Sequence, residues 1–215
     1  MLPKVVVVAP LSPSKTCIYC NQDLAPENIL CSSCKKVQPV PSPQPSYFSL
    51  LGFEPMLDLP ESELRNRFYS LSQKVHPDTH VLKDSYEQSH ASQWSALLNR
   101  AYQTLRTPHS RIDYLLELFP KPSQLRPNIP TDLAESFFEL QELISEGDAL
   151  GAIQQFESQL QSAQERYQSD WQKLVSAWKS APEKSALIAQ LHQLNHHFKY
   201  LASLKENLKK LQGRL

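Results

Sequence analysis

Apolar side chains recur at helical spacing on both sides of residue 76. In the stretch of about residues 60–75 they are Leu64, Phe68, Leu71 and Val75. In the stretch of about residues 85–105 they are Trp94, Leu97, Leu98, Ala101, Tyr102 and Leu105. Such spacing places each set on one face of an α-helix. The pattern predicts two amphipathic helices that fold back on each other as an antiparallel hairpin, with a short apolar segment at 47–53 packed across the pair.

Three more helix-patterned stretches follow residue 130, over about 131–147, 150–179 and 183–211. The inward positions of the first are Leu133, Phe137, Leu140 and Ile144. Ser180-Ala-Pro-Glu183 has the form of a capping box that opens the third. Because all three carry an apolar stripe, we expect them to bury one another as a three-helix bundle. No convincing strand alternation appears outside the N-terminal region, so the predicted fold class is all-α.

The tripeptide His76-Pro77-Asp78 separates the two helices of the predicted hairpin. A proline after histidine disfavours helical backbone at His76, so the tripeptide is predicted to be an exposed, stiff loop that displays an imidazole and a carboxylate. The alternative is an ordinary turn, where Asp and Pro are common for local reasons. The preceding helix carries three basic residues, Arg65, Arg67 and Lys74, each of which could equally be a solvated surface charge.

The stretch from about Ser46 to Phe119 resembles a J-domain, the module that recruits and stimulates DnaK-type heat-shock ATPase chaperones. The matching segments are 47–52 (Tyr-Phe-Ser-Leu-Leu-Gly), 65–75, the tripeptide at 76–78, and 99–108. The continuation at 109–116 is more specifically similar to HscB (Jac-type) proteins, the J-proteins devoted to iron–sulfur cluster assembly. Thr79 departs from the pattern, since many J-domains have lysine there. The resemblance implies a chaperone-binding site made of His76, Pro77, Asp78, Arg65, Arg67 and Lys74.

The predicted bundle resembles the C-terminal domain of HscB, which in that family holds the cluster-scaffold protein. The resemblance implies scaffold-binding residues on the first and third helices of the bundle, at Phe138, Glu139, Glu142 and Tyr200. Exposed aromatic side chains ringed by charge suit a protein interface. The alternative is that the aromatic side chains are core. Phe137 fits the core stripe, whereas Phe138 lies one position off it, which leaves burial and exposure both open.

The cysteines form two CxxC pairs, Cys17 with Cys20 and Cys31 with Cys34, separated by ten residues. Each pair can direct two thiolates toward one point, and two pairs complete a tetrahedral shell in which zinc is the default structural metal. A disulfide framework, a redox CxxC motif and an iron–sulfur cluster are the alternatives. The unit has little apolar core, so its folding is expected to depend on the metal.

Composition excludes several function classes. The chain has 22 Lys and Arg against 22 Asp and Glu, a balance that disfavours nucleic-acid binding. No apolar run approaches the roughly 20 residues needed to cross a bilayer. The chain has no Gly-rich phosphate loop, nucleophile triad or open metal site, so we expect that it is not an enzyme. His192, His196 and His197 are interpreted as polar-face residues rather than metal ligands.

These features divide the chain into a four-cysteine extension (1–36), a proline-rich linker (37–46), a J-domain (47–119), a joint (120–130) and a bundle (131–215). The expected function is that of a co-chaperone that stimulates a DnaK-type ATPase and delivers the iron–sulfur scaffold protein to it. The alternative is a general J-protein whose bundle mediates self-association or binds other clients. The first 16 residues have two lysines and no arginine, a poor mitochondrial presequence. We nevertheless expect the mitochondrial matrix, with the cytoplasm as the alternative.

Overall fold

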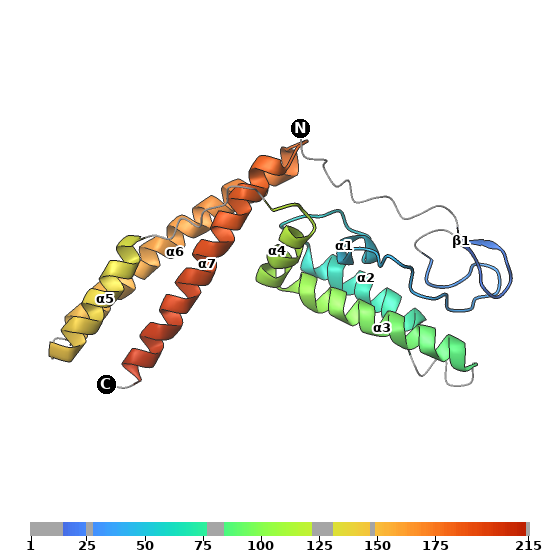
Figure 1. Cartoon of the computed structure of the whole chain (residues 1–215), viewed down its shortest axis with the longest axis horizontal. Helices are drawn as coiled ribbons and strands as arrows, with labels where there is room; N and C mark the ends of the chain where they lie inside the picture. The colour runs from blue at the N-terminus through green and yellow to red at the C-terminus, as the bar shows by residue number, and fades with distance from the viewer. Residues whose placement is uncertain (1–14, 25–27, 77–83, 122–130, 147–148, 214–215) are drawn as a thin grey trace. The chain divides into compact units, whose positions relative to one another are not determined.

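The computed structural model describes residues 15–24, 28–76, 84–121, 131–146 and 149–213. The chain divides into two compact units, Met1–Phe119 and Pro120–Leu215. Helices account for nearly all the regular structure of the described residues, apart from one short antiparallel hairpin near the N-terminus (Figure 1). The predicted all-α class is therefore confirmed. No helix in the described ranges has the length and apolarity to cross a membrane.

The middle of the first unit is the predicted helical hairpin. It consists of α2 (Glu61–Lys74) and α3 (Ser85–Arg106). Helix α1 (Tyr47–Leu50) packs against α3, and α4 (Pro108–Glu117) follows α3 in the chain and also packs against it. The ring of Phe68 on α2 stacks on the ring of Tyr102 on α3, with centroids 4.3 Å apart. The apolar positions of α3 that the sequence singled out are buried, with the exception of Tyr102, which is half-buried. The hairpin follows from these two facing stripes.

Helix α4 is fixed to the rest of the hairpin by a buried arginine that the sequence analysis did not single out. The guanidinium of Arg111 donates to the carbonyl of Leu57 (3.1 Å) and to the carbonyl of Leu105 (2.8 Å). Burial lowers the pKa of Arg111, an effect that the nearby Asp58 carboxylate opposes. A buried charge is tolerated only with such partners, so Arg111 is a structural residue that joins α4 to α3 and to the loop before α2.

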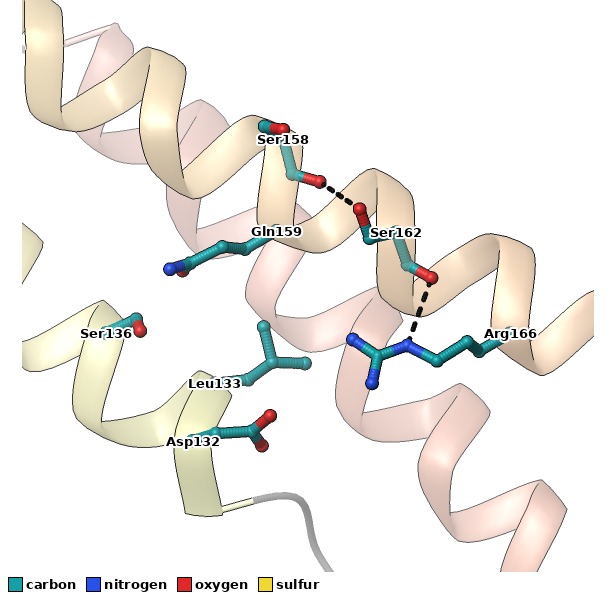
Figure 2. A pocket seen from close by; sticks show the side chains of 7 residues that line it. All are labelled: Asp132, Leu133, Ser136, Ser158, Gln159, Ser162 and Arg166. Carbon is teal, nitrogen blue, oxygen red and sulfur yellow. Dashed lines mark hydrogen bonds between the residues drawn. The ribbon is translucent and has the colours of Figure 1, made fainter.

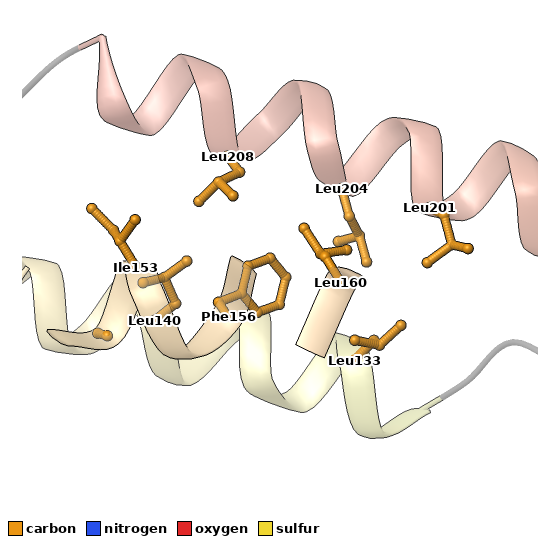
Figure 3. Close-up of a cluster of buried hydrophobic side chains, with 9 residues drawn as sticks. Leu133, Leu140, Ile153, Phe156, Leu160, Leu201, Leu204 and Leu208 are labelled. Atoms are coloured by element: carbon orange, nitrogen blue, oxygen red, sulfur yellow. The ribbon is translucent and has the colours of Figure 1, made fainter. Parts of the chain in front are cut away.

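The second unit consists of α5 (Thr131–Glu146), α6 (Ala149–Ser180) and α7 (Ser185–Gln212). Helix α6 packs against both α5 and α7. Figure 3 shows the shared core, in which side chains from all three helices point toward one another. Its buried members are Leu133, Leu140, Ala152, Ile153, Phe156, Leu160, Leu201, Leu204 and Leu208. The predicted three-helix bundle is thus present, and Phe137 and Ile144 pack partly buried against it.

Two local predictions about the third helix are wrong. Ser180 is the last residue of α6, and α7 begins at Ser185 after Lys184, without a side-chain cap. Pro182 disfavours helical backbone at Ala181, which ends α6 there and leaves Ser180 no helix to cap. His192 is only 8% exposed, because it faces inward with Leu191 and Asn195 rather than lying on a polar face.

Candidate functional site

The four cysteine thiols converge on one point in the first unit. All four sulfur atoms lie within 4.8 Å of one another, and the Sγ atoms of Cys17 and Cys34 and of Cys20 and Cys31 are 3.6 Å apart. A tetrahedral zinc with Zn–S bonds of about 2.3 Å separates its sulfurs by about 3.8 Å, so the spacing fits such an ion. It is far longer than the roughly 2.05 Å of a disulfide, and the four cysteines are free. The cluster can therefore hold a metal through four thiolates.

The two CxxC pairs are built in the same way. In the first, the amide of Cys17 donates to the carbonyl of Gln22 (2.7 Å) and the amide of Asn21 donates to the carbonyl of Cys17 (2.9 Å). In the second, the amides of Cys31 and Lys35 make the equivalent bonds, each 3.0 Å long, to the carbonyls of Lys36 and Cys31. Asn21 and Lys35 both have φ near 61°, the left-handed backbone that such a tight turn requires.

The short strands β1 (Lys15–Thr16) and β2 (Asp23–Leu24) pair across the first of these turns. An isolated bridge between Leu30 and Val37 pairs the chain across the second. These backbone contacts bring each pair of thiols to one side, as metal binding requires.

Backbone amide hydrogen bonds act to lower the pKa of three of the four thiols. Burial acts to raise the pKa of Cys17, but amide hydrogen bonds from Tyr19 and Cys20 outweigh it and lower this pKa to about 6. The pKa of Cys31 is also lowered, chiefly by the amide of Cys34. For Cys34, the amide of Lys36 acts to lower the pKa, but burial and the neighbouring thiols outweigh it and raise the pKa to about 12. A thiolate is the metal-binding form, and a divalent cation would offset the repulsion among four of them.

Of the predicted chaperone-binding tripeptide, only His76 falls within the described residues. It is exposed, two residues after α2 ends at Lys74. Pro77 and Asp78 lie outside the described residues. Arg65 is exposed on α2 and pairs with the carboxylate of Glu61 at 3.1 Å, while Lys74 is exposed in the last turn. Arg65 and Lys74 are thus both exposed, but they are nine residues apart, or about 180° around the helix, so they lie on opposite flanks of α2.

Arg67 has a different role from the other two basic residues of α2. Its guanidinium donates to the carbonyls of Gly52 and Leu51, binds the carboxylate of Glu63 and lies 4.1 Å from the centroid of the Phe53 ring. Gly52 has φ of 74°, and a Cβ there would lie 2.6 Å from Nη1 of Arg67. Arg67 therefore ties α2 to the turn after α1, and only part of its charge faces solvent.

The predicted scaffold-binding residues fall into two groups. Phe138, Glu139 and Glu142 are exposed on one side of α5, and the side chain of Phe138 is 66% exposed. The question that the sequence left open at Phe138 is thus decided in favour of exposure. Tyr200 is half-buried and packs against the bundle core, where burial and the Asp132 carboxylate raise its pKa. The structure therefore brings the three α5 residues together on the surface and places Tyr200 at the edge of the core.

A polar pocket of about 240 Å³ lies between α5 and α6 (Figure 2). It is lined by Asp132, Leu133, Ser136, Ser158, Gln159, Ser162 and Arg166. The Ser162 hydroxyl and the Arg166 guanidinium both donate to α6 carbonyls, at 3.0 and 3.4 Å. Ser136 and Phe138 are two residues apart, or about 200° around a helix, so the pocket and the Phe138 surface lie on different sides of α5.

Sequence reasoning missed the residues that join the four-cysteine unit to the hairpin. Val37 and Gln38, the first two residues of the predicted linker, are buried. The carbonyl of Gln38 accepts a hydrogen bond of 2.7 Å from the indole nitrogen of Trp94 on α3, and Lys36 pairs with Asp84 at 3.2 Å. A buried glutamine next to a proline-rich stretch cannot be recognised in a single sequence, because its burial depends on contact with Trp94, 56 residues later.

The chain is similar in sequence to known HscB proteins. No protein-family model matches the chain. The mouse protein named iron-sulfur cluster co-chaperone protein HscB is 25% identical over 187 residues, which cover 85% of this chain and 75% of that protein. The Arabidopsis thaliana HscB homolog is 31% identical over 147 residues, covering 67% of this chain and 57% of the plant protein.

Solved structures agree with the sequence relatives. The crystal structure of human co-chaperone protein HscB covers 94% of this chain, with a TM-score of 0.67 at 23% identity, and supports the fold. The chaperone HscB from Vibrio cholerae covers 79% of this chain, with a TM-score of 0.55 at 26% identity. Together with the described hairpin, bundle and four-cysteine cluster, these matches show that the chain belongs to the HscB family of co-chaperones.

Proposed function

We propose that this protein is a J-domain co-chaperone of iron–sulfur cluster assembly that stimulates a DnaK-type ATPase and delivers a cluster-scaffold protein to it. The HscB relatives support the co-chaperone part of the proposal, since the mouse and human proteins are named iron–sulfur cluster co-chaperones and the plant protein is named as a homolog. The observation that carries the delivery part is the exposed Phe138 with two carboxylates beside it on α5. The protein would act by bringing two partners together rather than by catalysing a reaction.

The chaperone arm of the mechanism is the end of the α2–α3 hairpin. We assign contact with the ATPase to His76, Pro77 and Asp78, with Arg65 and Lys74 on α2 attracting an acidic partner surface. Exposed charges of this kind raise the association rate more than the final affinity. Arg67 contributes less to this attraction than the other two, because its guanidinium is held by two carbonyls and Glu63. Its main contribution is to hold α2 against the turn after α1.

The scaffold arm is the surface of α5. Phe138 offers an exposed aromatic ring, and Glu139 and Glu142 surround it with negative charge, a combination typical of a protein-binding anchor. Tyr200 completes the site in this proposal through its exposed edge. Because both arms belong to one chain, a bound scaffold meets the chaperone at a raised effective concentration, which increases its transfer without any new contact.

The test of the chaperone arm is the ATPase rate of a purified DnaK-type chaperone with and without this protein. Asp78→Asn should abolish stimulation while leaving thermal stability and scaffold binding unchanged. Glu54→Gln is the matched control, because it also removes one carboxylate from the J-domain and Glu54 is exposed. Unchanged stimulation by Asp78→Asn would refute this arm. If the unsubstituted protein binds no scaffold, the bundle has another client or mediates self-association.

The metal in the four-cysteine cluster is proposed to be a structural zinc. Four thiolates leave no open position for a substrate, which distinguishes such a site from a catalytic one. Elemental analysis should give one zinc per chain, with thiols that react slowly until the metal is removed. Iron with visible absorbance would point to a cluster instead. The mitochondrial matrix remains the proposed compartment, with the cytoplasm as the alternative, and fractionation of cells decides between them.

A further inference from the structure

The four-cysteine unit comprises residues 15–24 and 28–38, and it makes three polar contacts with α3 and its N-cap residue. The carbonyl of Gln38 accepts from the Trp94 indole, as described above. The hydroxyl of Tyr19 lies 3.2 Å from Nδ1 of His90, and Nζ of Lys36 lies 3.2 Å from the Asp84 carboxylate. Lys36 also lies over the Tyr19 ring, 4.5 Å from its centroid, so two of the three contacts support each other. The contacts span the N-terminal half of α3 and include its N-cap residue, Asp84.

The same half of α3 also carries three buried residues. Glu87, Ala91 and Trp94 are all buried, at spacings of four and three residues that place them on one side of the helix. Trp94 contacts the four-cysteine unit directly, and the charges of Glu87 and Lys36 interact. The four-cysteine unit therefore covers part of α3 and is not an independent extension on a spacer.

Each contact residue is positioned by the metal-binding turns. Tyr19 lies between Cys17 and Cys20, and Lys36 follows Cys34 by two residues, with its carbonyl accepting from the amide of Cys31 at 3.0 Å. The remaining contact residue, Gln38, is hydrogen-bonded to both turns.

Gln38 is 4% exposed and connects the two halves of the unit. Its side chain accepts from the amide of Ile18 (3.3 Å) and donates to the carbonyl of Lys36 (3.0 Å), and its own amide donates to Ile29 (2.8 Å). It thereby joins the first turn, the second turn and α3 in one hydrogen-bond network.

The apolar content of the unit is too small to maintain this arrangement without metal. Among the described residues its buried apolar side chains are only Leu24, Ile29 and Val37, and the other buried members, Cys17 and Cys31, would themselves be metal ligands. In such units the metal-binding free energy is the folding free energy. Loss of the ion should therefore release Tyr19, Lys36 and Gln38 together.

We infer that the metal-bound four-cysteine unit stabilises the N-terminal half of α3. Gln38 is the positioning residue through which metal binding affects this helix. Metal removal then loosens α3 at its start while leaving its C-terminal half packed on α2. If the proposed chaperone site at residues 76–78 is correct, metal occupancy also influences chaperone stimulation, because Asp84 follows that tripeptide by six residues. This last consequence depends on the proposed function, whereas the effect on α3 does not.

Amide hydrogen exchange of the full-length chain tests the inference, with the zinc-loaded protein compared with the same protein after chelation. Exchange at residues 88–94 should become at least about tenfold faster without zinc, and exchange at residues 97–105 should change less than about twofold. An unchanged rate at 88–94, with faster exchange in the cysteine turns, would overturn the inference. An equal acceleration in both halves of α3 would also overturn it, because the metal would then support the whole J-domain.

Two variants separate the contact from the metal. Trp94→Phe keeps a buried ring but removes the donor to Gln38, and should speed exchange at 88–94 about threefold with one zinc still bound. Lys36→Ala removes the partly exposed ion pair with Asp84, so it should speed exchange at residues 88–94 by a smaller factor. Ile18→Ala is the control, since this side chain is 60% exposed on the same turn. If the two contact variants behave like the control, the contacts do not hold α3.

The ATPase assay distinguishes failure of this inference from failure of the proposed function. Chelation should lower stimulation of the chaperone, whereas Asp78→Asn should abolish stimulation with normal exchange at α3. If the zinc-loaded protein stimulates nothing, the proposed function is wrong and the exchange result still decides the inference. If chelation changes neither exchange nor stimulation, the inference alone fails.

Discussion

The sharpest test of the scaffold-binding surface uses two adjacent phenylalanines with opposite environments. Phe138 is 66% exposed on α5, whereas Phe137 packs against the bundle core with its ring centroid 5.5 Å from that of Phe156. Replacing each with alanine removes the same atoms. We therefore expect Phe138→Ala to affect binding alone and Phe137→Ala to affect stability first.

The magnitudes follow from the areas involved. An aromatic side chain offers roughly 200 Å², so two-thirds exposure at Phe138 leaves about 130 Å² for a partner to cover, worth at most about 3 kcal/mol at about 25 cal/mol per Å². Costs of association reduce this, and we expect a loss of about 1.5–3 kcal/mol, or about 10- to 150-fold in Kd. Phe137→Ala should lower the free energy of unfolding by about 2–3 kcal/mol, less than for a fully buried ring.

The assay is titration calorimetry with the purified scaffold protein, accompanied by urea denaturation of each variant. Leu150→Ala is the control, because this side chain is 79% exposed at the start of α6 and its loss removes a comparable apolar area elsewhere. A change in Kd of less than about threefold for Phe138→Ala would refute the proposed anchor. A large loss of stability in that variant would instead mean that Phe138 belongs to the core.

Three further predictions concern stability. Gly52→Ala should lower the free energy of unfolding by about 1–2 kcal/mol, because φ is 74° and the new Cβ meets the Arg67 guanidinium; Glu54→Ala, exposed two residues later, is the control in the same denaturation assay. Arg111→Met should cost about 3 kcal/mol or more in the same measurement, since the carbonyls of Leu57 and Leu105 lose their buried donor, and an unchanged midpoint would contradict this role. Burial lowers the pKa of His192, and the charges of His196 and Lys121 lower it further. The unfolded chain therefore binds the proton more readily than the folded chain. The contribution of neutral His192 to stability is complete above about pH 6.5 and declines as the pH falls below that value. His192→Gln should therefore flatten the decline in melting temperature between pH 7.5 and 5, and an equal decline in both proteins would count against it.

The elements of the fold were predictable because each depends on local periodicity. The α2 and α3 stripes, the three bundle helices and the two CxxC turns all arise from residues close together in sequence, and the structure has all of them. The cysteine spacing alone predicted a common site for four thiols, because a CxxC turn directs both sulfurs to one side. The capping box at residues 180–183 failed for a local reason as well, since Pro182 outweighed Ser180.

What the sequence determined by itself is thus the helices of the hairpin and of the bundle and the metal-binding turns, through spacing that neighbouring residues impose on one another. Tertiary structure alone decided that Arg67 is held by carbonyls of the α1 turn, that Arg111 is buried, that Phe138 faces solvent and that Gln38 joins the cysteine turns to α3. These outcomes depend on partners that lie 6 to 56 residues away or on which side of a helix the neighbouring elements cover. Periodicity carries no information about such partners, because burial and pairing are set by packing between elements rather than by order along the chain.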